Sequence, residues 1–274
     1  MEISGKTELL AVVGKPIRHS LSPKLHNFLS QKLNLDYVYT AFEPQNIPDT
    51  FKAIRTLGIK GVNVTAPYKY DALANVDVVS ENARFCGSVN TVVNNNGVLT
   101  GYSTDGDGLY MSMKLSGIEV ENKKILVLGA GGASKPICVM LKQKGAESVY
   151  VKNRTVSKAE ELCRELNDVM NTDIFKVYVE SRDFDIIINT TSVGMGTDEN
   201  PLDDMGLLDK CIAAVDIVYH PRKTAFMKSA EAKNVKAING LGMLVFQGII
   251  AYEYFTGVKV PEELFGEVVE YIDE

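Results

Sequence analysis

Short apolar runs alternate with amphipathic stretches in the first part of the chain. The run 9–14 ends at Gly14-Lys15-Pro16, as a buried strand that enters a loop does. Ser22-Pro23 predicts a helix start, because serine is a favoured N-cap and proline a favoured first helical residue. The next expected elements are a strand, a helix and a strand at 37–42, 47–57 and 59–64. This alternation predicts a parallel sheet with right-handed crossovers.

A hairpin is expected next. The turn Asn94-Asn95-Asn96-Gly97 separates the strand-like segments 88–93 and 98–100, and Asn-Gly is the dipeptide that tight hairpin turns favour. One antiparallel pair is therefore expected in a mainly parallel sheet.

A second α/β pattern, of Rossmann-like type, begins at Lys123. Its strands are apolar on successive residues, as in a sheet that helices cover on both faces. The expected strands are 125–129, 148–152, 174–179, 184–189 and 213–218, and the expected helices are 109–115, one ending near Gly145, and 159–166.

The C-terminal stretch 241–255 is apolar nearly all round, and Pro261 opens a last helix that runs to Ile272. A helix so apolar must pack between other elements, and we expect it to return to the first domain, with Gln247 projecting into a cleft. The fold class is thus α/β with two domains that flank a cleft. The expected domains are 1–103 plus 239–274 and 104–238.

Composition narrows the function classes. The 274 residues are 45% apolar and carry a net charge of −6, so no net positive field favours nucleic acid or a membrane surface. Neither a secretory signal nor an apolar run of about 20 residues that could cross a bilayer is recognised. We expect a soluble cytoplasmic protein, a monomer or homodimer, that acts on a small molecule.

A metal site is not expected. The widely spaced cysteines, which we expect to be reduced thiols, are Cys86, Cys138, Cys163 and Cys211. The histidines, too few and scattered for a metal or a Ser-His-Asp triad, are His19, His26 and His220.

A glycine-rich turn follows the buried strand and opens a helix. Backbone N–H groups at a helix N-terminus face such a turn, so a pyrophosphate fits there. The pattern is G-x-G-x-x-[GA] with a serine in the third small position, and a tight turn without a ligand is the alternative. The candidate cofactor-binding residues here are Gly129, Ala130, Gly131, Gly132, Ala133 and Ser134.

The end of the next expected strand discriminates between cofactors. NAD-binding sheets usually carry an acidic residue there for the ribose 2′-hydroxyl, and this chain has none. Arg154 and Lys158 can bind a 2′-phosphate instead. We therefore expect NADP, with Asn153 and Thr155 in the same site; a solvated basic turn is the alternative.

Polar residues gather at the ends of apolar segments in the first domain. Ligands of parallel sheets lie beyond the carboxyl ends of strands, and hydroxyl and amide groups suit a polyhydroxylated small molecule. Taken singly, Ser22 could be a plain N-cap and Asn90 a strand residue facing water. The candidate substrate-binding residues are Ser20, Ser22, Asn63, Thr65, Lys69, Asn90 and Asp105.

Lys69 and Asp105 form the pair most able to transfer protons. Hydride removal from an alcohol carbon needs a group that takes the hydroxyl proton, and a partly buried amine can do so near neutral pH. A surface ion pair, or two unrelated loop charges, is the alternative.

Together these motifs resemble the shikimate dehydrogenase family. The stretches that carry the resemblance, in the family's order, are Gly14-Lys15-Pro16 with His19-Ser20-Leu21-Ser22-Pro23, Asn63-Val64-Thr65-Ala66-Pro67-Tyr68-Lys69, Gly87-Ser88-Val89-Asn90-Thr91, Gly101 with Thr104-Asp105 and Gly108, the glycine turn, Asn153-Arg154-Thr155, Asp216-Ile217-Val218-Tyr219 with Pro221 and Thr224, and Asn239-Gly240-Leu241 with Met243-Leu244 and Gln247-Gly248.

The resemblance implies NADP-dependent interconversion of 3-dehydroshikimate and shikimate in aromatic amino acid biosynthesis, with Lys69 and Asp105 as the catalytic pair. It adds Tyr219 and Gln247 to the substrate contacts. It adds Ile217 and Gly240 to the cofactor contacts.

The departures from the family pattern are small. Ala66 stands where the family often has a larger apolar residue, and Tyr254-Phe255 lies near a position often held by tryptophan. Two alternatives stay open, an NAD-preferring quinate/shikimate dehydrogenase and a catalytically silent dinucleotide-binding regulator on the same fold.

Overall fold

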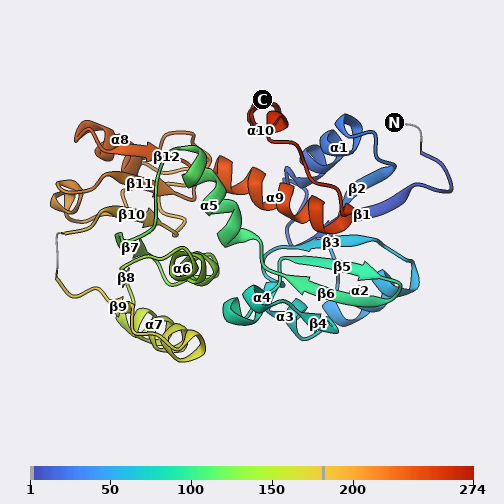
Figure 1. Cartoon of the computed structure of the whole chain (residues 1–274), viewed down its shortest axis with the longest axis horizontal. Helices are drawn as coiled ribbons and strands as arrows, with labels where there is room; N and C mark the ends of the chain where they lie inside the picture. The colour runs from blue at the N-terminus through green and yellow to red at the C-terminus, as the bar shows by residue number, and fades with distance from the viewer. Residues whose placement is uncertain (1–2, 181–182) are drawn as a thin grey trace. The chain divides into compact units, whose positions relative to one another are not determined.

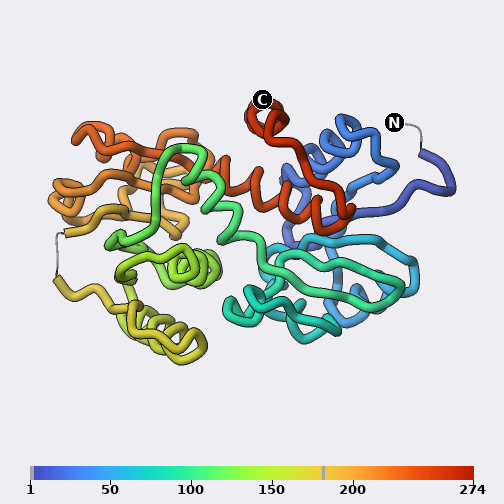
Figure 2. Tube along the Cα trace, viewed as in Figure 1, coloured from blue at the N-terminus to red at the C-terminus, as the bar shows by residue number. Residues whose placement is uncertain are grey.

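The computed structural model describes residues 3–180 and 183–274, which form two compact α/β units (Figure 1). Unit 1 is discontinuous and comprises Met1–Thr104 and Val245–Glu274, and unit 2 comprises Asp105–Leu244. The trace in Figure 2 runs from blue to cyan through unit 1, from green to orange through unit 2, and returns in red to unit 1.

Unit 1 contains a sheet of six strands in the order β2-β1-β3-β5-β6-β4, counted over the described residues. The strands are β1 Glu8–Val13, β2 Tyr37–Phe42, β3 Gly61–Val64, β4 Val78–Val79, β5 Thr91–Asn95 and β6 Val98–Tyr102. Strand β5 runs against both of its neighbours, β3 and β6, and the other pairs are parallel. The expected antiparallel pair, β5 with β6, is confirmed, and β3 with β5 forms a second antiparallel pair that was not expected.

The hairpin turn itself is as predicted. Asn95 pairs with Val98 across a two-residue loop, in which Asn96 has φ +53° and Gly97 has φ +90°. Positive φ at both central residues is what tight hairpin turns require. The Asn94 side chain braces the turn by accepting a hydrogen bond from the Gly97 N–H at 2.8 Å.

Helices cover this sheet. They are α1 Ser22–Lys32, α2 Ile47–Thr56, α3 Lys69–Leu73, α4 Glu81–Cys86 and α10 Glu263–Asp273, together with most of α9 Leu241–Thr256. Helix α1 includes Ser22 as its first residue, and the Ser20 Oγ accepts a hydrogen bond from the Ser22 N–H at 3.2 Å. The expectation that Ser22 caps the helix was wrong, because Ser20 supplies the oxygen at this end.

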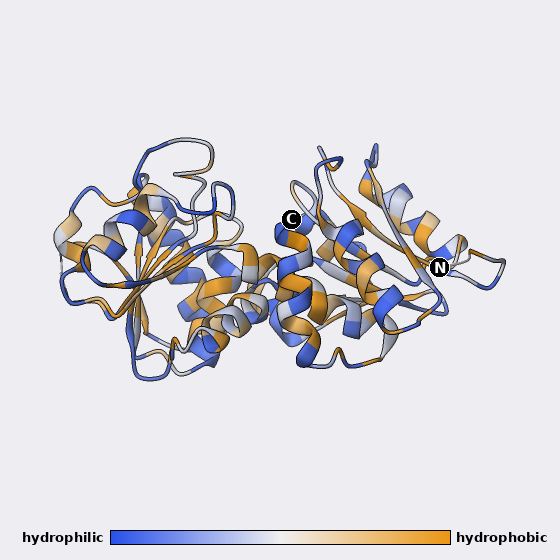
Figure 3. Cartoon of the chain, turned by 90° about the horizontal axis from the view of Figure 1, so that it is seen from above, coloured by the Kyte–Doolittle hydropathy of each residue, from blue (hydrophilic) through white to orange (hydrophobic). Residues whose placement is uncertain are grey.

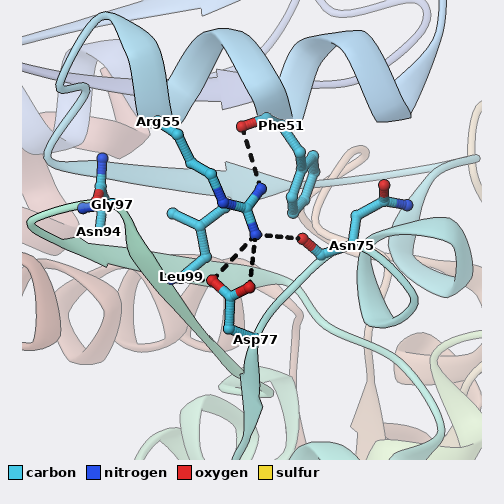
Figure 4. A network of polar contacts seen from close by, with 7 residues as sticks. All are labelled: Phe51, Arg55, Asn75, Asp77, Asn94, Gly97 and Leu99. Atoms are coloured by element: carbon cyan, nitrogen blue, oxygen red, sulfur yellow. Dashed lines mark hydrogen bonds and ion pairs between the residues drawn. The ribbon is translucent and has the colours of Figure 1, made fainter.

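A polar network fastens α2 to the strands beside it (Figure 4). The Arg55 Nη2 donates to both carboxylate oxygens of Asp77 at 3.0 Å and to the carbonyl of Asn75 at 3.2 Å. The Asp77 Oδ2 also accepts from the Leu99 N–H at 2.7 Å. That hydrogen bond, and then the nearby Arg55, hold the pKa of Asp77 below its usual value.

Helix α9 packs into unit 1 through close contacts at glycines. A Cβ on Gly248 would lie 2.2 Å from Leu25 Cδ2 of α1, and a Cβ on Gly61 would lie 2.1 Å from Phe255 Cδ1. Tyr254, next in sequence to Phe255, stacks on Tyr102 with ring centroids 4.1 Å apart. Aromatic contacts thus fill the space around Tyr254 and Phe255, one of the two places where the sequence differs from the pattern it resembles. None of the helices in the described residues is long and apolar enough to cross a bilayer.

Unit 2 holds a fully parallel sheet in the order β12-β11-β10-β7-β8-β9, again counted over the described residues. The strands are β7 Lys124–Leu128, β8 Ser148–Lys152, β9 Phe175–Val177, β10 Ile186–Asn189, β11 Ala213–Asp216 and β12 Lys236–Ile238. The chain order reverses between β7 and β10, as in doubly wound nucleotide-binding folds. Figure 3 shows these strands mainly in the hydrophobic colour, consistent with their burial.

The helical elements of unit 2 are α5 Asp105–Leu115, α6 Ser134–Gln143, α7 Val156–Met170, α8 Ala225–Ala232 and the short η1 Met205–Leu208. The first turn of α9 also belongs to unit 2. The Gly240 N–H donates to the carbonyl of Val218 at 3.1 Å, and a Cβ on Gly242 would lie 2.2 Å from Ser112 Oγ. These contacts explain why 239–244, which we expected in the first domain, group with unit 2.

Candidate functional site

The loops after β1 and β3 leave the same edge of the unit 1 sheet, because the two strands are parallel neighbours. The Lys15 N–H donates to the carbonyl of Ala66 at 3.1 Å, and the Thr65 N–H donates to the carbonyl of Val13 at 2.9 Å. Gly14 permits this approach, since a Cβ there would lie 2.3 Å from Thr65 Cγ2. The chain order reverses between these two strands, which is where open sheets bind ligands.

Asn63 is buried near the end of β3, and its side chain is held from three sides. Its Nδ2 donates to the carbonyl of Asn90 at 3.2 Å and to Thr91 Oγ1 at 3.0 Å. Its Oδ1 accepts from the Tyr39 hydroxyl at 2.8 Å. The amide therefore has one defined orientation at the ligand-binding edge of the sheet.

Asn90 fixes the backbone that leads to Asp105. The Asn90 Oδ1 accepts from the Thr104 N–H at 2.9 Å, and the Nδ2 donates to Thr104 Oγ1 at 3.0 Å. Asn90 is 4% exposed, which excludes a strand residue that faces water. Asp105 follows Thr104 directly and begins α5, four residues before the helix start that we expected. It is also buried.

Lys69 begins the short helix α3 and is partly exposed. Its carbonyl accepts from the Val89 N–H at 2.9 Å, so the backbone of Lys69 is joined to the segment that carries Asn90. The Tyr68 N–H donates to the carbonyl of Thr65 at 3.0 Å. Thr65, Lys69 and Asn90 are thus linked through the main chain.

The remaining substrate-binding candidates lie on helices or in loops. Ser20 and Ser22 stand at the start of α1, and the Ser22 side chain lies near Tyr39. Gln247 is half-buried on α9, next to the glycine that packs against α1. Tyr219 is exposed in the loop after β11. Asp105 and Tyr219 belong to unit 2, and unit 1 contains Ser20, Ser22, Asn63, Thr65, Lys69, Asn90 and Gln247.

The glycine turn of unit 2 leaves the carboxyl end of β7. Gly129 has φ +111°, and a Cβ there would lie 2.8 Å from Thr190 Oγ1, so only glycine suits this position. The Ala130 N–H donates to Asn153 Oδ1 at 3.2 Å, and the Asn153 Nδ2 donates to the carbonyl of Thr155 at 2.8 Å. Asn153 therefore joins the turn to the loop after β8.

Ser134, the departure from the dinucleotide-binding pattern, has a structural role in this turn. Its Oγ accepts from the Gly131 N–H at 3.0 Å and lies 2.7 Å from Thr190 Oγ1. The Thr190 hydroxyl donates to the carbonyl of Leu128 at 2.7 Å, so Ser134 is the donor toward Thr190. Ser134 is fully buried. Its hydroxyl forms hydrogen bonds within the protein, and these stabilise the conformation of the turn.

The exposed part of the turn is suited to an anion. A Cβ on Gly131 would meet no atom within 4 Å. The N–H groups of Gly132 and Ala133 donate to no group within residues 3–180 and 183–274. Both precede α6, where the helix dipole favours negative charge.

Positive charge lies at the start of α7. Arg154, Thr155 and Lys158 are all exposed. Neither Arg154 nor Lys158 forms an ion pair with another described residue, and the first turn of α7 contains no acidic residue. These groups offer charge-assisted hydrogen bonds to a phosphate.

Ile217 and Gly240 are brought together at the same edge of the unit 2 sheet. A Cβ on Gly240 would lie 1.9 Å from the carbonyl oxygen of Ile217. The two backbones therefore touch, and only glycine allows this contact.

Sequence reasoning missed a buried carboxyl group that organises this edge. The Asp216 Oδ1 accepts from the Asn189 Nδ2 at 2.9 Å and from the Val218 N–H at 3.0 Å, and the Oδ2 accepts from the Thr224 hydroxyl at 2.7 Å. Burial raises the pKa of Asp216, and these donors oppose the shift. Asp216 and Thr224 were recognised only as parts of a motif.

Tyr39 and Thr190 were also missed. Thr190 directly follows the expected strand 184–189, so its place after a buried strand was a usable signal. Tyr39 lies within a strand, and nothing in its pattern distinguishes it. Among the described residues, no three His, Cys, Asp or Glu side chains converge in a way that could hold a metal ion.

Family models match the chain in three successive segments. Residues 12–92 match the shikimate dehydrogenase substrate binding domain, residues 111–197 match shikimate / quinate 5-dehydrogenase, and residues 240–270 match the shikimate 5′-dehydrogenase C-terminal domain.

Individual relatives agree with these matches. The shikimate dehydrogenase (NADP(+)) of Alkaliphilus metalliredigens is 40% identical over 280 residues, and the match covers 98% of each chain. The shikimate 5-dehydrogenase of Listeria monocytogenes, solved in complex with shikimate and NAD, has a TM-score of 0.90 at 35% identity over 98% of each chain. That of Thermus thermophilus, in complex with NADP(H) and shikimate, has a TM-score of 0.87 at 35% identity over 97% of this chain and 99% of the other.

Proposed function

The chain belongs to the shikimate dehydrogenase family, and we propose that it interconverts shikimate and 3-dehydroshikimate with NADP as the hydride carrier. The observation that carries this proposal is the set of hydroxyl, amide and amine side chains at the carboxyl edge of the unit 1 sheet. Because such groups recognise a small polyhydroxylated ring, we assign substrate binding to unit 1 and the cofactor to unit 2.

The residues of unit 2 fit NADP. The open turn with N–H groups at Gly132 and Ala133 would hold the pyrophosphate, and Arg154 and Lys158 would hold the 2′-phosphate. Bound NADP supplies the acceptor for the hydride that leaves the alcohol carbon. Ser134 and Asn153 keep the turn in shape, and Ile217 and Gly240 border the same sheet edge.

The proton chemistry falls to Lys69 and Asp105. As the C–H bond breaks and its electron pair leaves as hydride, the hydroxyl must lose its proton, and the Lys69 Nζ in its neutral form accepts it. In the reverse direction the ammonium returns this proton to the carbonyl oxygen. Asp105 is the second member of the proposed catalytic pair, and its backbone is fixed through Thr104 and Asn90. Ser20, Ser22, Asn63, Thr65, Asn90, Tyr219 and Gln247 are the proposed substrate contacts.

A spectroscopic assay tests this function. Shikimate plus NADP should give rising absorbance at the reduced-nicotinamide band, with slower reduction of NAD and weaker turnover of quinate. Because the Listeria monocytogenes relative was solved with NAD, the rates of reduction of NAD and of NADP must be compared in the same assay. Faster turnover with NAD would replace the NADP assignment with the NAD-preferring alternative. Binding of both ligands without any turnover would favour the silent regulator.

We also propose that the protein works in the cytoplasm. Cys86, Cys138, Cys163 and Cys211 are free thiols, and thiols persist in a reducing compartment.

A further inference from the structure

We propose that Tyr39 is a positioning residue for substrate binding, which makes Asn63 a pure hydrogen-bond acceptor toward a substrate hydroxyl. This inference rests on the proposed function and adds a residue to it. Tyr39 lies on β2, outside every motif that identified the site. It is 2% exposed, so it acts only through the residues it touches.

The direction of the hydrogen bonds around Asn63 follows from its neighbours. The carbonyl oxygen of Asn90 can only accept, so the Asn63 Nδ2 must face it, at 3.2 Å. The Oδ1 then faces the Tyr39 hydroxyl, which must donate, at 2.8 Å. The second Nδ2 hydrogen is used by Thr91 Oγ1, at 3.0 Å. A side-chain amide has two hydrogens and two lone pairs, so one lone pair of Oδ1 is left for a ligand.

Tyr39 also engages a second proposed substrate contact. The Ser22 side chain lies near the Tyr39 phenol and opposes the rise in its pKa. Burial outweighs this effect and raises the pKa of Tyr39 well above its usual value, so the phenol keeps its proton. The protonated phenol therefore remains available to donate to Asn63.

The ring and backbone of Tyr39 are themselves fixed. Its ring stacks on His26 with centroids 4.1 Å apart and planes 1° apart. Burial lowers the pKa of His26 to about 3, so this partner is neutral. The Asn27 side chain accepts from the Tyr39 N–H at 2.8 Å and donates to the Tyr39 carbonyl at 2.9 Å. Tyr39 thus places its hydroxyl without help from any ligand.

Kinetics of Tyr39→Phe test the proposal, because this change removes the hydroxyl and keeps the stacked ring. We expect the KM for shikimate to rise about 10-fold, as for the loss of one buried hydrogen bond, while the KM for NADP stays within about 2-fold. Tyr37→Phe, two residues away on the same strand, is the matched control and should leave both constants unchanged. A rise in both KM values together, or none in that for shikimate, would overturn the proposal.

A double-mutant cycle separates positioning from a general loss of stability. If Tyr39 acts through Asn63, then Tyr39→Phe should add little to the KM of Asn63→Ala, whereas independent roles should multiply their effects. Fully multiplicative effects contradict the proposal.

A measurement on the unmodified chain covers the case in which Tyr39→Phe does not fold. In the ¹⁵N NMR spectrum, both Nδ2 protons of Asn63, identified by their loss in Asn63→Ala, should be protected from exchange before and after shikimate binds. Rapid exchange of either proton overturns the acceptor assignment. Failure of the proposed function would show separately, as absent turnover by the unmodified enzyme.

Discussion

At the residue scale, Arg154 is the proposed determinant of cofactor choice. Arg154→Ala should raise the KM for NADP about 10- to 100-fold, because a charge-assisted hydrogen bond contributes about 1.5 to 3 kcal/mol. The KM for shikimate and the use of NAD should barely change. Steady-state kinetics with each cofactor measure this change. Arg164→Ala is the control, because Arg164 is exposed on α7, the helix that follows Arg154. Equal losses of activity with NAD and with NADP would mean that Arg154 supports the fold.

Lys69 gives the second prediction at this scale. Because Lys69 is the proposed proton-transfer group, Lys69→Ala should lower kcat about 10²- to 10⁴-fold, with a smaller effect on the KM for NADP. Circular dichroism checks that the variant is folded. Lys60→Ala, just before the opposite end of β3, should keep normal kcat. A folded Lys69→Ala enzyme with more than about a tenth of kcat would remove Lys69 from catalysis.

The sequence could supply the chemical types of the site residues but not their hydrogen-bond partners. The polar residues after β1 and β3 were accessible to prediction, because strand ends can be located from apolar runs. The link from Tyr39 to Asn63 joins residues 24 positions apart, and no local pattern encodes such a pair. Ser134 is similar, since its bond to Thr190 spans 56 positions.

At the scale of elements, the contact between β11 and the start of α9 depends on Gly240. Gly240→Ala would place a Cβ 1.9 Å from the Ile217 carbonyl oxygen, and backbone must move to relieve the overlap. We expect a loss of about 3 kcal/mol in the free energy of unfolding, measured in urea. We also expect a raised KM for NADP, since Ile217 and Gly240 are proposed cofactor contacts.

Gly266→Ala is the matched control for this change. Gly266 lies inside α10, where a Cβ would meet no atom within 4 Å. This substitution should stabilise the protein by about 0.5 to 1 kcal/mol, because alanine has the higher helix propensity. If Gly240→Ala were equally harmless, the backbone contact would have no energetic importance.

The longer elements were predictable, and the elements that were missed are short. The apolar strands of both sheets and helices such as α2 have clear periodicity. The short elements α3, α4, β4, α8 and β12 were not predicted. Segments of this length have little intrinsic stability and form only because the rest of the fold packs against them. Helix α5 was predicted too short, because its first turn contains Asp105, Gly106 and Asp107, which are poor helix formers.

At the scale of the whole molecule, the carboxyl groups of Asp216 and Asp77 should make opposite contributions to the pH dependence of stability. Burial raises the pKa of Asp216 above its ordinary 3.8, so the native state holds this proton to higher pH than the unfolded chain does. Its contribution to stability is complete below about pH 4 and is lost as pH rises through the raised pKa. The free energy of unfolding of Asp216→Asn, measured relative to that of the unmodified protein, should therefore rise from pH 4 upward.

Asp77→Asn provides the comparison. The pKa of Asp77 is lowered, first by the Leu99 N–H, so its contribution is present above pH 3.8 and is lost as pH falls through the folded-state pKa. Urea midpoints measured between pH 3 and 7 test both signs. A constant difference between Asp216→Asn and the unmodified protein over this range would show that Asp216 has the same pKa in both states.

Unit 1 is assembled from two segments that flank unit 2 in the sequence, so it cannot fold completely until unit 2 has been synthesised. Its first segment leaves a gap that Phe255 fills against Gly61, and Tyr252 of α9 donates from its hydroxyl to Ser30 Oγ at 3.1 Å. Both aromatic residues follow the whole of unit 2 in the sequence, so they are synthesised after it. The middle unit, continuous from Asp105 to Leu244, can complete its core earlier, since domains fold as units while translation continues. Unit 1 therefore completes its core after unit 2.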